Sequence, residues 1–507
     1  MLDLLIVGGG INGCAIARDA AGRGLSVRLV EKGDLASCTS SASTKLIHGG
    51  LRYLEHFEFR LVREALAERE VMLATAPHLV SPLTFVLPHE PQLRPAWMIR
   101  LGLFLYDRLA PRGRLEGSRG VSLKDTPFGA PLRDGFAQGF TYADCWVDDA
   151  RLVVANALSA SDLGASVTPG VTFISAERHA DRWIARLETP QGFEEIEART
   201  LVNAAGPYVS HVLHDALRID SRKHVRLVKG SHLVTRRLYE GAHAYILQNP
   251  DRRVVFVIPY EGEFTLIGST DVPYEGAPGP VAISDAEADY LLTAVSRCFR
   301  REVTRDDIVS SYAGLRPLFD DGSFEASVVT RDYAFDLDRE GAPALSIFGG
   351  KITTARRLAE HALETLEESF ARMGPSWTAM TPLAGGEGLE GELAPLLAQL
   401  LHERPFLPRP LALRLAKAYG ERVFRVLGSA QSMEELGEDF GCGLTRQELD
   451  YLIAEEWART ADDVLWRRSK LGLHMSPSQC ERVARAIGRP PVGAGRGRTG
   501  GGGRLCG

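Results

Sequence analysis

Three glycines near the start of the chain have the spacing of a nucleotide-binding turn. Gly8, Gly10 and Gly13 form the pattern G-x-G-x-x-G between an apolar segment and a run of small residues. Glycines in this pattern permit a tight turn, a close approach of the backbone to a pyrophosphate, and close packing of a helix on a strand. Glu31 follows about 18 residues later, where a carboxylate accepts hydrogen bonds from ribose hydroxyls. An isolated pattern would fit an ordinary glycine turn, but this context favours dinucleotide binding.

The segments around these glycines predict a βαβ unit. Residues 4–7 are an apolar run typical of a strand, and 11–21 predict a helix whose small side chains can pack closely on a sheet. Gly22 ends that helix, and 27–30 is the second strand. A helix that begins directly after the glycine turn offers unpaired N–H groups and a positive dipole end to phosphates.

The rest of the chain predicts a second sheet followed by helices. We expect strands at 226–234, 253–259 and 264–268, in a mostly antiparallel sheet that could cover a ligand beside the nucleotide-binding layer. Composition shifts to Gly, Pro and Thr near 372–391, where we place a domain boundary. Helices are expected at 352–369, 391–402, 410–428, 445–473 and 477–488, and the Gly- and Arg-rich stretch 490–507 is expected to be a disordered tail.

Bulk composition excludes several classes of protein. The chain has 507 residues, which predicts two or three domains, and its formal net charge of −6 argues against a dedicated nucleic-acid binder. Its seven cysteines include no C-x-x-C pair, so no metal site is expected. We expect the cysteines to be reduced thiols in the cytoplasm. We expect neither a signal peptide nor a membrane-spanning helix.

Further motifs carry a family resemblance. The longest reads TSSASTKLIHGGLRYL over 39–54, and FGGKITT covers 348–354. Shorter motifs are VNAAGP at 202–207, GLRPL at 314–318, TRDY at 330–333 and RRSKLGL at 467–473. Together they resemble the signatures of the FAD-dependent, aerobic and respiratory glycerol-3-phosphate dehydrogenases.

The resemblance implies a fold, a cofactor and partners. The implied fold class is α/β: a Rossmann-like FAD-binding domain interleaved with an antiparallel-sheet substrate domain over 1–375, then a C-terminal helical domain over 390–489. FAD is the implied cofactor, and sn-glycerol 3-phosphate is oxidised to dihydroxyacetone phosphate. Electrons then pass to ubiquinone or menaquinone. The resemblance places the protein in the cytoplasm, peripherally bound to the surface of the cytoplasmic membrane, with a homodimer as a family-level expectation.

A hydroxyl-rich run adds donors for the cofactor. Residues 39–44 could donate hydrogen bonds to the pyrophosphate or to the edge of the isoalloxazine ring. The alternative is a polar loop held by local turn bonds, but the neighbouring glycine turn favours the flavin. The resemblance extends the expected FAD contacts to Gly8, Gly10, Asn12, Gly13, Glu31, Thr39, Ser40, Ser41, Ser43, Lys45, Leu46, His48, Gly49, Gly50, Ala205, Gly206, Gly350, Lys351, Ile352 and Thr353.

A phosphorylated substrate needs fixed cations, and four lie within the family motifs. Arginine can bind a phosphate through two hydrogen bonds, whereas lysine acts as a point charge. Taken singly, each side chain would be assigned to a surface ion pair, but their places in the motifs favour the substrate. One could instead stabilise negative charge on the reduced flavin, a catalytic role for Arg316. The substrate candidates are Arg52, Arg316, Arg331 and Lys351, with Tyr53 as a donor or a packing residue.

The reaction also needs a base for the hydroxyl proton while hydride leaves C2 for flavin N5. Histidine has a suitable pKa near neutrality. We expect His232, in the sequence KGSH, to be that base and His48 to be an orienting hydrogen-bond donor. The alternative for either histidine is a structural hydrogen bond.

A segment rich in aromatic and basic residues bears on the membrane. Residues 93–112 combine Trp97 and Phe104 with Arg100 and Arg108, as in a helix that lies in a lipid interface. The same pattern fits a helix buried on one side against the protein. The family's quinone partner favours the membrane.

Two other functions would keep many of these motifs. A glycerol-3-phosphate oxidase would pass electrons to oxygen and release peroxide, using the same substrate residues. A non-catalytic, membrane-docked redox sensor would keep the FAD fingerprint but lose the cations and histidines, which are present here. Amino-acid oxidases share the FAD fold but need one cation for a carboxylate rather than a cluster for a phosphate.

Overall fold

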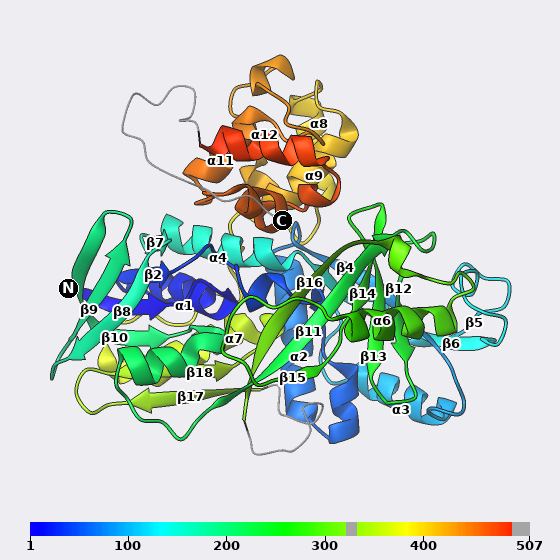
Figure 1. The fold of residues 1–507 in the computed structure, drawn as a ribbon, viewed down its shortest axis with the longest axis horizontal. Coiled ribbons are helices and arrows are strands. Elements are labelled where there is room, and N and C mark those ends of the chain that lie inside the picture. Colours follow the sequence, from blue (N-terminus) through cyan, green and yellow to red (C-terminus); the bar gives the residue numbers. More distant parts are fainter. Residues whose placement is uncertain (321–331, 489–507) are drawn as a thin grey trace. The chain divides into compact units, whose positions relative to one another are not determined.

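The computed structural model describes residues 1–320 and 332–488, except the side chains of Arg52 and His56. It contains two compact units, Met1–Arg425 and a second that begins at Val426. The first unit holds two sheets, and its chain passes between them several times (Figure 1). This arrangement confirms the interleaved fold class. The domain limits at 375 and 390 stay predictions, and the tail 490–507 lies outside the described residues.

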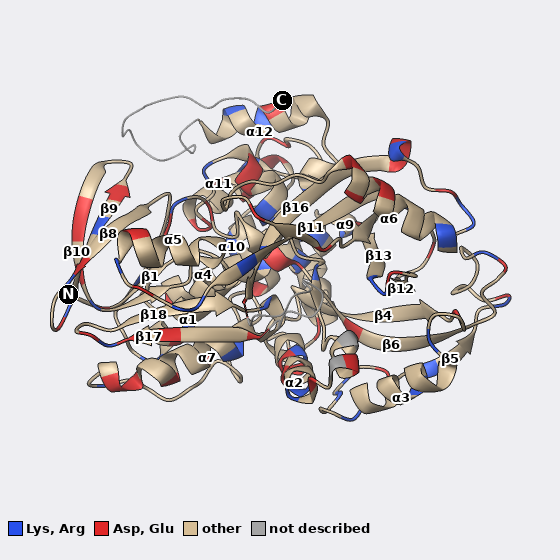
Figure 2. Ribbon diagram, turned by 60° about the horizontal axis from the view of Figure 1, so that its bottom comes forward, with Lys and Arg blue, Asp and Glu red and all other residues tan. Residues whose placement is uncertain are grey.

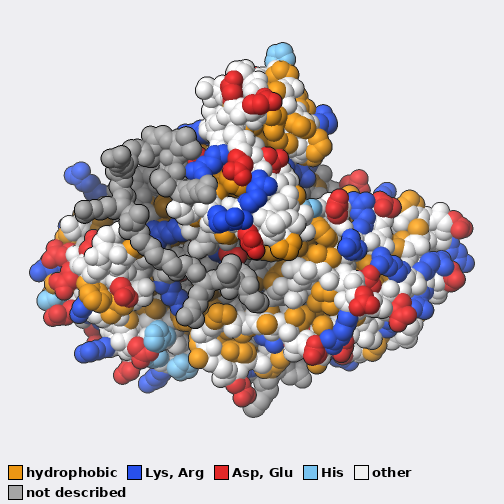
Figure 3. Space-filling view, turned by 45° about the horizontal axis from the view of Figure 1, so that its top comes forward, with side chains coloured by type: hydrophobic (Ala, Val, Ile, Leu, Met, Phe, Trp, Pro, Cys, Tyr) orange, Lys and Arg blue, Asp and Glu red, His pale blue; other side chains and the backbone are white. Residues whose placement is uncertain are grey.

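Charged residues are distributed over many elements of the described chain (Figure 2). On the face drawn in Figure 3, Lys and Arg side chains alternate with Asp and Glu rather than gathering in one field. Among the described helices, none combines the length and the apolar character needed to cross a bilayer.

The first sheet has eight strands and carries the glycine turn. Its centre is parallel, because β1 pairs with β2 from Leu4↔Val27 onward and with β10 from Leu2↔Ala198 onward. Parallel strands are usually buried on both faces, which explains the continuous apolar run at the start of the chain. In spatial order the strands are β17 Tyr333–Asp338, β18 Ala344–Gly349, β10 Gly192–Asn203, β1 Leu2–Val7, β2 Val27–Glu31 and β7 Ser166–Pro169. β9 Trp183–Thr189 also pairs with β10, and β8 Thr172–Arg178 pairs with β9.

Three helices pack together beside this sheet. α1 (Ile11–Gly22) is nearly all buried, and its small side chains let α4 (Asp149–Asp162) and α7 (Ala355–Leu366) approach it. The single helix expected at 352–369 is shorter than predicted, because tight 3₁₀ turns flank α7 at both ends. The remaining helices of this unit include α2 Phe59–Thr75, α3 Ala96–Tyr106, α5 Val209–His211, α8 Ala394–Glu403 and α9 Arg409–Tyr419.

The second sheet has ten strands and is antiparallel except where β4 meets β12. The strands predicted at 226–234, 253–259 and 264–268 are confirmed as β11 Val225–Arg236, β13 Val254–Tyr260 and β14 Phe264–Gly268. The others are β3 Leu46–Ile47, β4 Val80–Pro88, β5 Arg119–Ser122, β6 Gln138–Val147, β12 Ala244–Gln248, β15 Val272–Tyr274 and β16 Ile308–Phe319.

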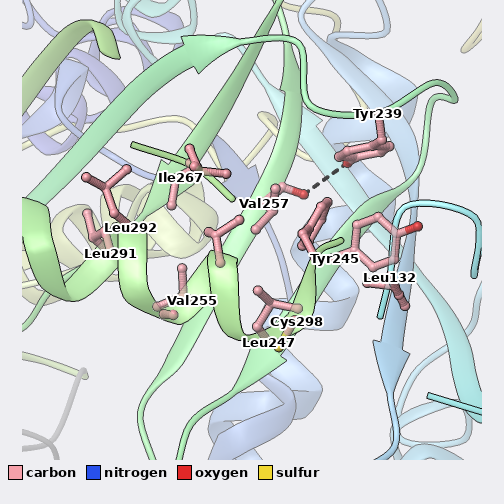
Figure 4. Close-up of a cluster of buried hydrophobic side chains, with 14 of the residues drawn as sticks. Leu132, Tyr239, Tyr245, Leu247, Val255, Val257, Ile267, Leu291, Leu292 and Cys298 are labelled. Atoms are coloured by element: carbon pink, nitrogen blue, oxygen red, sulfur yellow. Dashed lines mark hydrogen bonds between the residues drawn. The ribbon is translucent and has the colours of Figure 1, made fainter. Parts of the chain in front are cut away.

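Helix α6 (Asp285–Cys298) covers one face of the second sheet (Figure 4). Its side chains Leu291 and Leu292 join Val255 and Val257 in a buried apolar cluster. Since successive strand residues point to opposite faces, the neighbours of these valines, such as Phe256, face the other way. That second face is the one left to form a site.

The C-terminal segments are helical as predicted, but the segment 445–473 is not one continuous helix. α11 (Arg446–Ala454) ends well before 473, and a separate helical turn spans Asp463–Arg468. The Asp463 carboxylate accepts from the backbone N–H of Arg459 at 2.7 Å and of Thr460 at 2.9 Å. These bonds start a new helical segment, and α12 (Pro477–Ile487) follows it.

Candidate functional site

The turn between β1 and α1 forms an anion-binding helix end. Gly10 precedes α1 without a capping side chain, and no acidic residue lies in the first helical turn. A Cβ on Gly13 would lie 2.0 Å from the carbonyl oxygen of Gly8, which itself has a φ of +116°. Positions 8 and 13 therefore require glycine, and the backbone at the positive end of the helix dipole can come close to a pyrophosphate.

Glu31 stands at the end of β2, at the edge of this turn. Its carboxylate accepts from the backbone N–H of Gly9 at 2.7 Å and from that of Gly33 at 2.8 Å. Each carboxylate oxygen has a second lone pair, so Glu31 can still accept hydrogen bonds from ribose hydroxyls.

Two polar side chains complete the helix end. Ser40 Oγ accepts from the N–H of Ile11 at 3.0 Å, which brings the hydroxyl-rich run to the start of α1. Asn12 Nδ2 donates to Gly349 O at 3.3 Å, while its Oδ1 is buried with no hydrogen-bond partner among the described residues. A buried acceptor without a donor fits a site that a nucleotide completes.

A cavity of ≈ 290 Å³ lies next to this turn. Its walls come from the segment 39–55, the second face of strands β4, β6, β12 and β13, the end of β16, and the turn 350–353. Segments far apart in the sequence therefore meet at one place. Of the residues predicted from the sequence, the walls include Thr39, Ser40, Ser43, Leu46, His48, Gly50, Tyr53, Arg316, Gly350, Lys351, Ile352 and Thr353.

The other predicted residues stand elsewhere. Ala205 and Gly206 follow β10 beside the glycine turn, where the backbone of Ala204 lies close to Gly8. Arg331 and the side chain of Arg52 lie outside the described residues, so their roles stay predictions. The cavity walls do not include the predicted residues Ser41, Lys45, Gly49 and His232.

Arg316 is a cation of the cavity wall whose direction is fixed by its neighbours. It extends from β16 across Gly230, where a Cβ would lie 2.3 Å from a guanidinium nitrogen. Its guanidinium forms an ion pair with Asp271 and donates to Ser269 Oγ at 2.7 Å. These contacts fix the direction of the guanidinium, and Arg316 lines the cavity, where a guanidinium can bind an anionic group.

A second cation lies at the turn after β18. Lys351 Nζ stands 4.1 Å from the centre of the Tyr53 ring, and both residues line the cavity. A cation over an aromatic face is attracted to the ring, which helps to hold Lys351 in place. The cavity wall therefore holds Arg316 and Lys351 from different elements, besides Arg94, which pairs with Glu55.

His232 occupies a position that the sequence did not indicate. Its side chain has 0% exposure, its Nε2 lies 2.9 Å from Thr44 Oγ1, and its ring stacks on Tyr312 at 4.7 Å. Burial, reinforced by the charges of Arg316 and Lys45, holds the pKa of His232 well below its usual value. A neutral histidine behind Thr44 reaches the cavity only through that hydroxyl, whereas His48 is itself part of the wall.

Lys45, predicted to contact the cofactor, is buried in an ion pair. Its Nζ lies 2.8 Å from Asp149 Oδ1 and donates to Ser41 O at 3.1 Å. The same carboxylate accepts from Ser43 Oγ at 2.7 Å. The pair therefore fastens the hydroxyl-rich run to the start of α4, which gives Lys45 a positioning role.

The sequence analysis missed a buried network beside His48. Tyr106 Oη donates to Asp144 at 2.8 Å and accepts from the N–H of Gly49 at 2.8 Å, and Arg69 donates to the same carboxylate at 2.8 Å. Burial raises the pKa of Asp144 to about 6. The only signal in the sequence was the alternation of Tyr142 and Asp144 along a strand, which places both side chains on one face.

Comparison with known proteins now places the chain. Residues 3–356 match the model of the FAD dependent oxidoreductases, and 376–489 match that of the C-terminal domain of alpha-glycerophosphate oxidase. A glycerol-3-phosphate dehydrogenase of Pseudomonas aeruginosa is 55% identical over 96% of this chain and 94% of its own. The chain belongs to the FAD-dependent glycerol-3-phosphate dehydrogenase family.

Two further relatives refine this membership. The crystal structure of glycerol-3-phosphate dehydrogenase from Bacillus halodurans in complex with FAD has a TM-score of 0.75 and 27% identity, covering 96% of this chain and 94% of that one. A D-erythritol 1-phosphate dehydrogenase of Brucella abortus is 50% identical over 95% of this chain and 96% of its own. This member of the glycerol-3-phosphate dehydrogenase family is therefore an FAD-dependent oxidoreductase, and its glycine turn, Glu31 and Asn12 fit that cofactor.

Proposed function

We propose that the enzyme oxidises sn-glycerol 3-phosphate to dihydroxyacetone phosphate and passes the electrons to a quinone in the cytoplasmic membrane. The observation that carries the substrate is the pairing of two cations, Arg316 and Lys351, with His48 in one cavity. The names of close relatives support the same substrate.

The two cations bind the phosphate. Arg316 is oriented in advance by Ser269 and Asp271, so little side-chain entropy is lost when it forms hydrogen bonds with phosphate oxygens. Lys351 adds a point charge from another element. Arg52 and Arg331 remain candidates for the same group.

His48 takes the proton of the C2 hydroxyl. It lines the cavity on the extension of β3, which pairs with β6 through Ile47↔Cys145 and so brings His48 opposite Asp144. We propose His48 as the base in place of His232, which positions Thr44 instead. Bound FAD supplies the acceptor for the hydride and its two electrons.

D-erythritol 1-phosphate is a second candidate substrate. It shares the phosphate and the adjacent hydroxyls but is longer by one hydroxylated carbon, and the relative named for it is 50% identical to this chain. Both substrates need the same cations, so the residues described above do not by themselves decide between them.

The test is flavin reduction under anaerobic conditions. The holoenzyme is mixed with sn-glycerol 3-phosphate, D-erythritol 1-phosphate or glycerol, and the flavin absorbance is followed by stopped flow. We expect rapid bleaching with glycerol 3-phosphate and none with glycerol. Faster bleaching with the four-carbon substrate would replace the proposed substrate, and no bleaching of fully loaded enzyme by either phosphate would refute the dehydrogenase. Peroxide release in air, without turnover of a quinone, would favour the oxidase.

Helix α3 is the proposed membrane contact. Ile99, Leu103 and Tyr106 are buried, whereas its outer face exposes Trp97 (66%) and Leu101 (51%). Single exposed apolar residues are ordinary, but Met98 and Phe104 extend the same face, with basic residues beside it. An apolar face flanked by arginines suits a surface of anionic lipids that holds quinone.

Vesicle sedimentation tests this surface. We expect the enzyme to bind vesicles of anionic phospholipid and the triple variant Trp97→Ser/Leu101→Ser/Phe104→Ser to lose most of that binding, with unchanged turnover of a water-soluble acceptor. Phe193→Ser, at an equally exposed aromatic of β10, is the matched control. Equal binding of both variants would contradict the role of α3. A peripheral location and a homodimer remain part of the same proposal.

A further inference from the structure

Tyr142 is a buried aromatic residue with a fixed ring in the wall of the cavity. It lies on β6, is only 4% exposed, and stands directly opposite Phe85 of β4. Its ring stacks on Phe85 at 5.2 Å and meets the edge of Tyr106 at 5.9 Å. Contacts on two sides leave the ring little freedom, so its hydroxyl points in one direction.

The hydroxyl of Tyr142 has no hydrogen-bond partner among the described residues. The hydroxyl oxygen is not fully buried, and Tyr142 lines the cavity. The hydroxyl therefore faces the cavity. Burial, together with the charge of Asp144, holds the pKa of Tyr142 well above its usual value, so the group remains a donor at neutral pH. Buried polar groups normally have partners, so this hydroxyl is available to a ligand in the cavity.

The surroundings decide which part of a ligand this donor meets. Asp144 follows two residues later on the same strand face and lines the same wall. A carboxylate at this point repels a phosphate but accepts a hydrogen bond from a neutral hydroxyl. The cations that would hold the phosphate, Arg316 and Lys351, come from other elements.

We propose that Tyr142 binds the terminal C1 hydroxyl of the substrate and thereby selects for it. This assignment rests on the proposed oxidation of glycerol 3-phosphate. The substrate then lies with its phosphate at Arg316 and Lys351 and its opposite end at Tyr142, with the C2 hydroxyl left for His48. Tyr142 is a substrate-binding residue that determines specificity and takes no part in proton transfer.

The experiment removes in turn the two partners of this hydrogen bond, the Tyr142 hydroxyl and the terminal hydroxyl of the substrate. Flavin reduction is measured with sn-glycerol 3-phosphate and with propane-1,2-diol 1-phosphate of matching configuration, which lacks the terminal hydroxyl. Wild type is compared with Tyr142→Phe, which keeps the ring. Tyr260→Phe is the matched control, since Tyr260 on β13 is equally buried but is not part of the cavity wall.

We expect Tyr142→Phe to lower kcat/KM for glycerol 3-phosphate about three- to tenfold, the range for one neutral hydrogen bond, and to leave the diol phosphate unchanged. Tyr260→Phe should leave kcat/KM unchanged for both substrates. A loss shared equally by both substrates would make Tyr142 merely structural, and no loss would also overturn the assignment. A wild-type enzyme inert with both phosphates would overturn the proposed function and the assignment with it, which separates the two failures.

Discussion

The ion pair of Lys45 and Asp149 gives the sharpest test of how the cofactor loop is held. Both side chains are almost fully buried, at 2% and 0% exposure, with 2.8 Å between Nζ and Oδ1. Lys45→Met keeps the length and volume of the side chain but removes the charge. Asp149 is then left as a buried carboxylate whose ionic partner is gone.

The structure sets the size of the effect. Removing one partner of a buried ion pair costs about 3–5 kcal/mol, because the remaining charge is desolvated and unpaired. Asp149 keeps hydrogen bonds from Ser43 Oγ and from the backbone N–H of Ala150, which places the cost at the lower end, about 3 kcal/mol. Spread over the unit Met1–Arg425, an unfolding entropy of about 2.1 cal/mol/K per residue converts this into a Tm lower by ~3 °C.

Flavin fluorescence on heating reports both unfolding and cofactor release. Lys45→Met should shift the release midpoint downward, and the double variant Lys45→Met/Asp149→Asn should recover at least half of the loss. Lys124→Met, at an exposed lysine, is the control and should change the midpoint little. Turnover of the loaded Lys45→Met enzyme should stay within about twofold of wild type, since Lys45 lies outside the cavity wall. Unchanged stability with collapsed turnover would refute the positioning role.

Three further changes have defined outcomes. Gly13→Ala should yield protein without bound FAD, because the new Cβ would lie 2.0 Å from Gly8 O, whereas Gly102→Ala, with no atom within 4 Å, should retain full flavin absorbance. Arg316→Gln should lower kcat/KM for glycerol 3-phosphate about 10- to 100-fold through loss of a charged hydrogen bond, and unchanged kinetics would remove Arg316 from the site. Because burial raises the pKa of Asp144 to about 6, above the unfolded value of about 3.9, this carboxyl contributes stability that is present below pH 4 and lost as the pH rises to 6. The Tm of wild type relative to Asp144→Asn should therefore fall by ~3 °C between pH 4 and pH 7, and a rise would contradict the burial of that charge.

The sequence predicted the elements that depend on local patterns. The glycine turn, Glu31 and the strands of the second sheet follow from spacing and alternation, and the structure has them at the expected places. The cations and His48 were found through motifs, since their meeting depends on segments that are distant in the chain.

What the sequence could not predict depends on burial. Lys45 and His232 have residue types suited to catalysis, and only the structure shows that their neighbours, Asp149 and Tyr312, enclose them. The sequence does not single out Tyr142, because a tyrosine in a strand is usually a packing residue, and its hydroxyl is seen to lack a partner only among the residues that the structure describes. The prediction of one helix over 445–473 was wrong because the Asp463 carboxylate accepts hydrogen bonds from backbone N–H groups and so starts a new helical turn.

The order in which the strands of the first sheet are synthesised has a consequence for biogenesis. β1 leaves the ribosome first, but its partner β10 begins at Gly192, and β18, which pairs with β10, ends only at Gly349. A nascent chain shorter than this exposes parallel edges that nothing yet covers, and non-local pairing of this kind folds slowly. The first sheet is therefore complete only once the chain has been synthesised past Gly349, and until then its unpaired edges are open to chaperones.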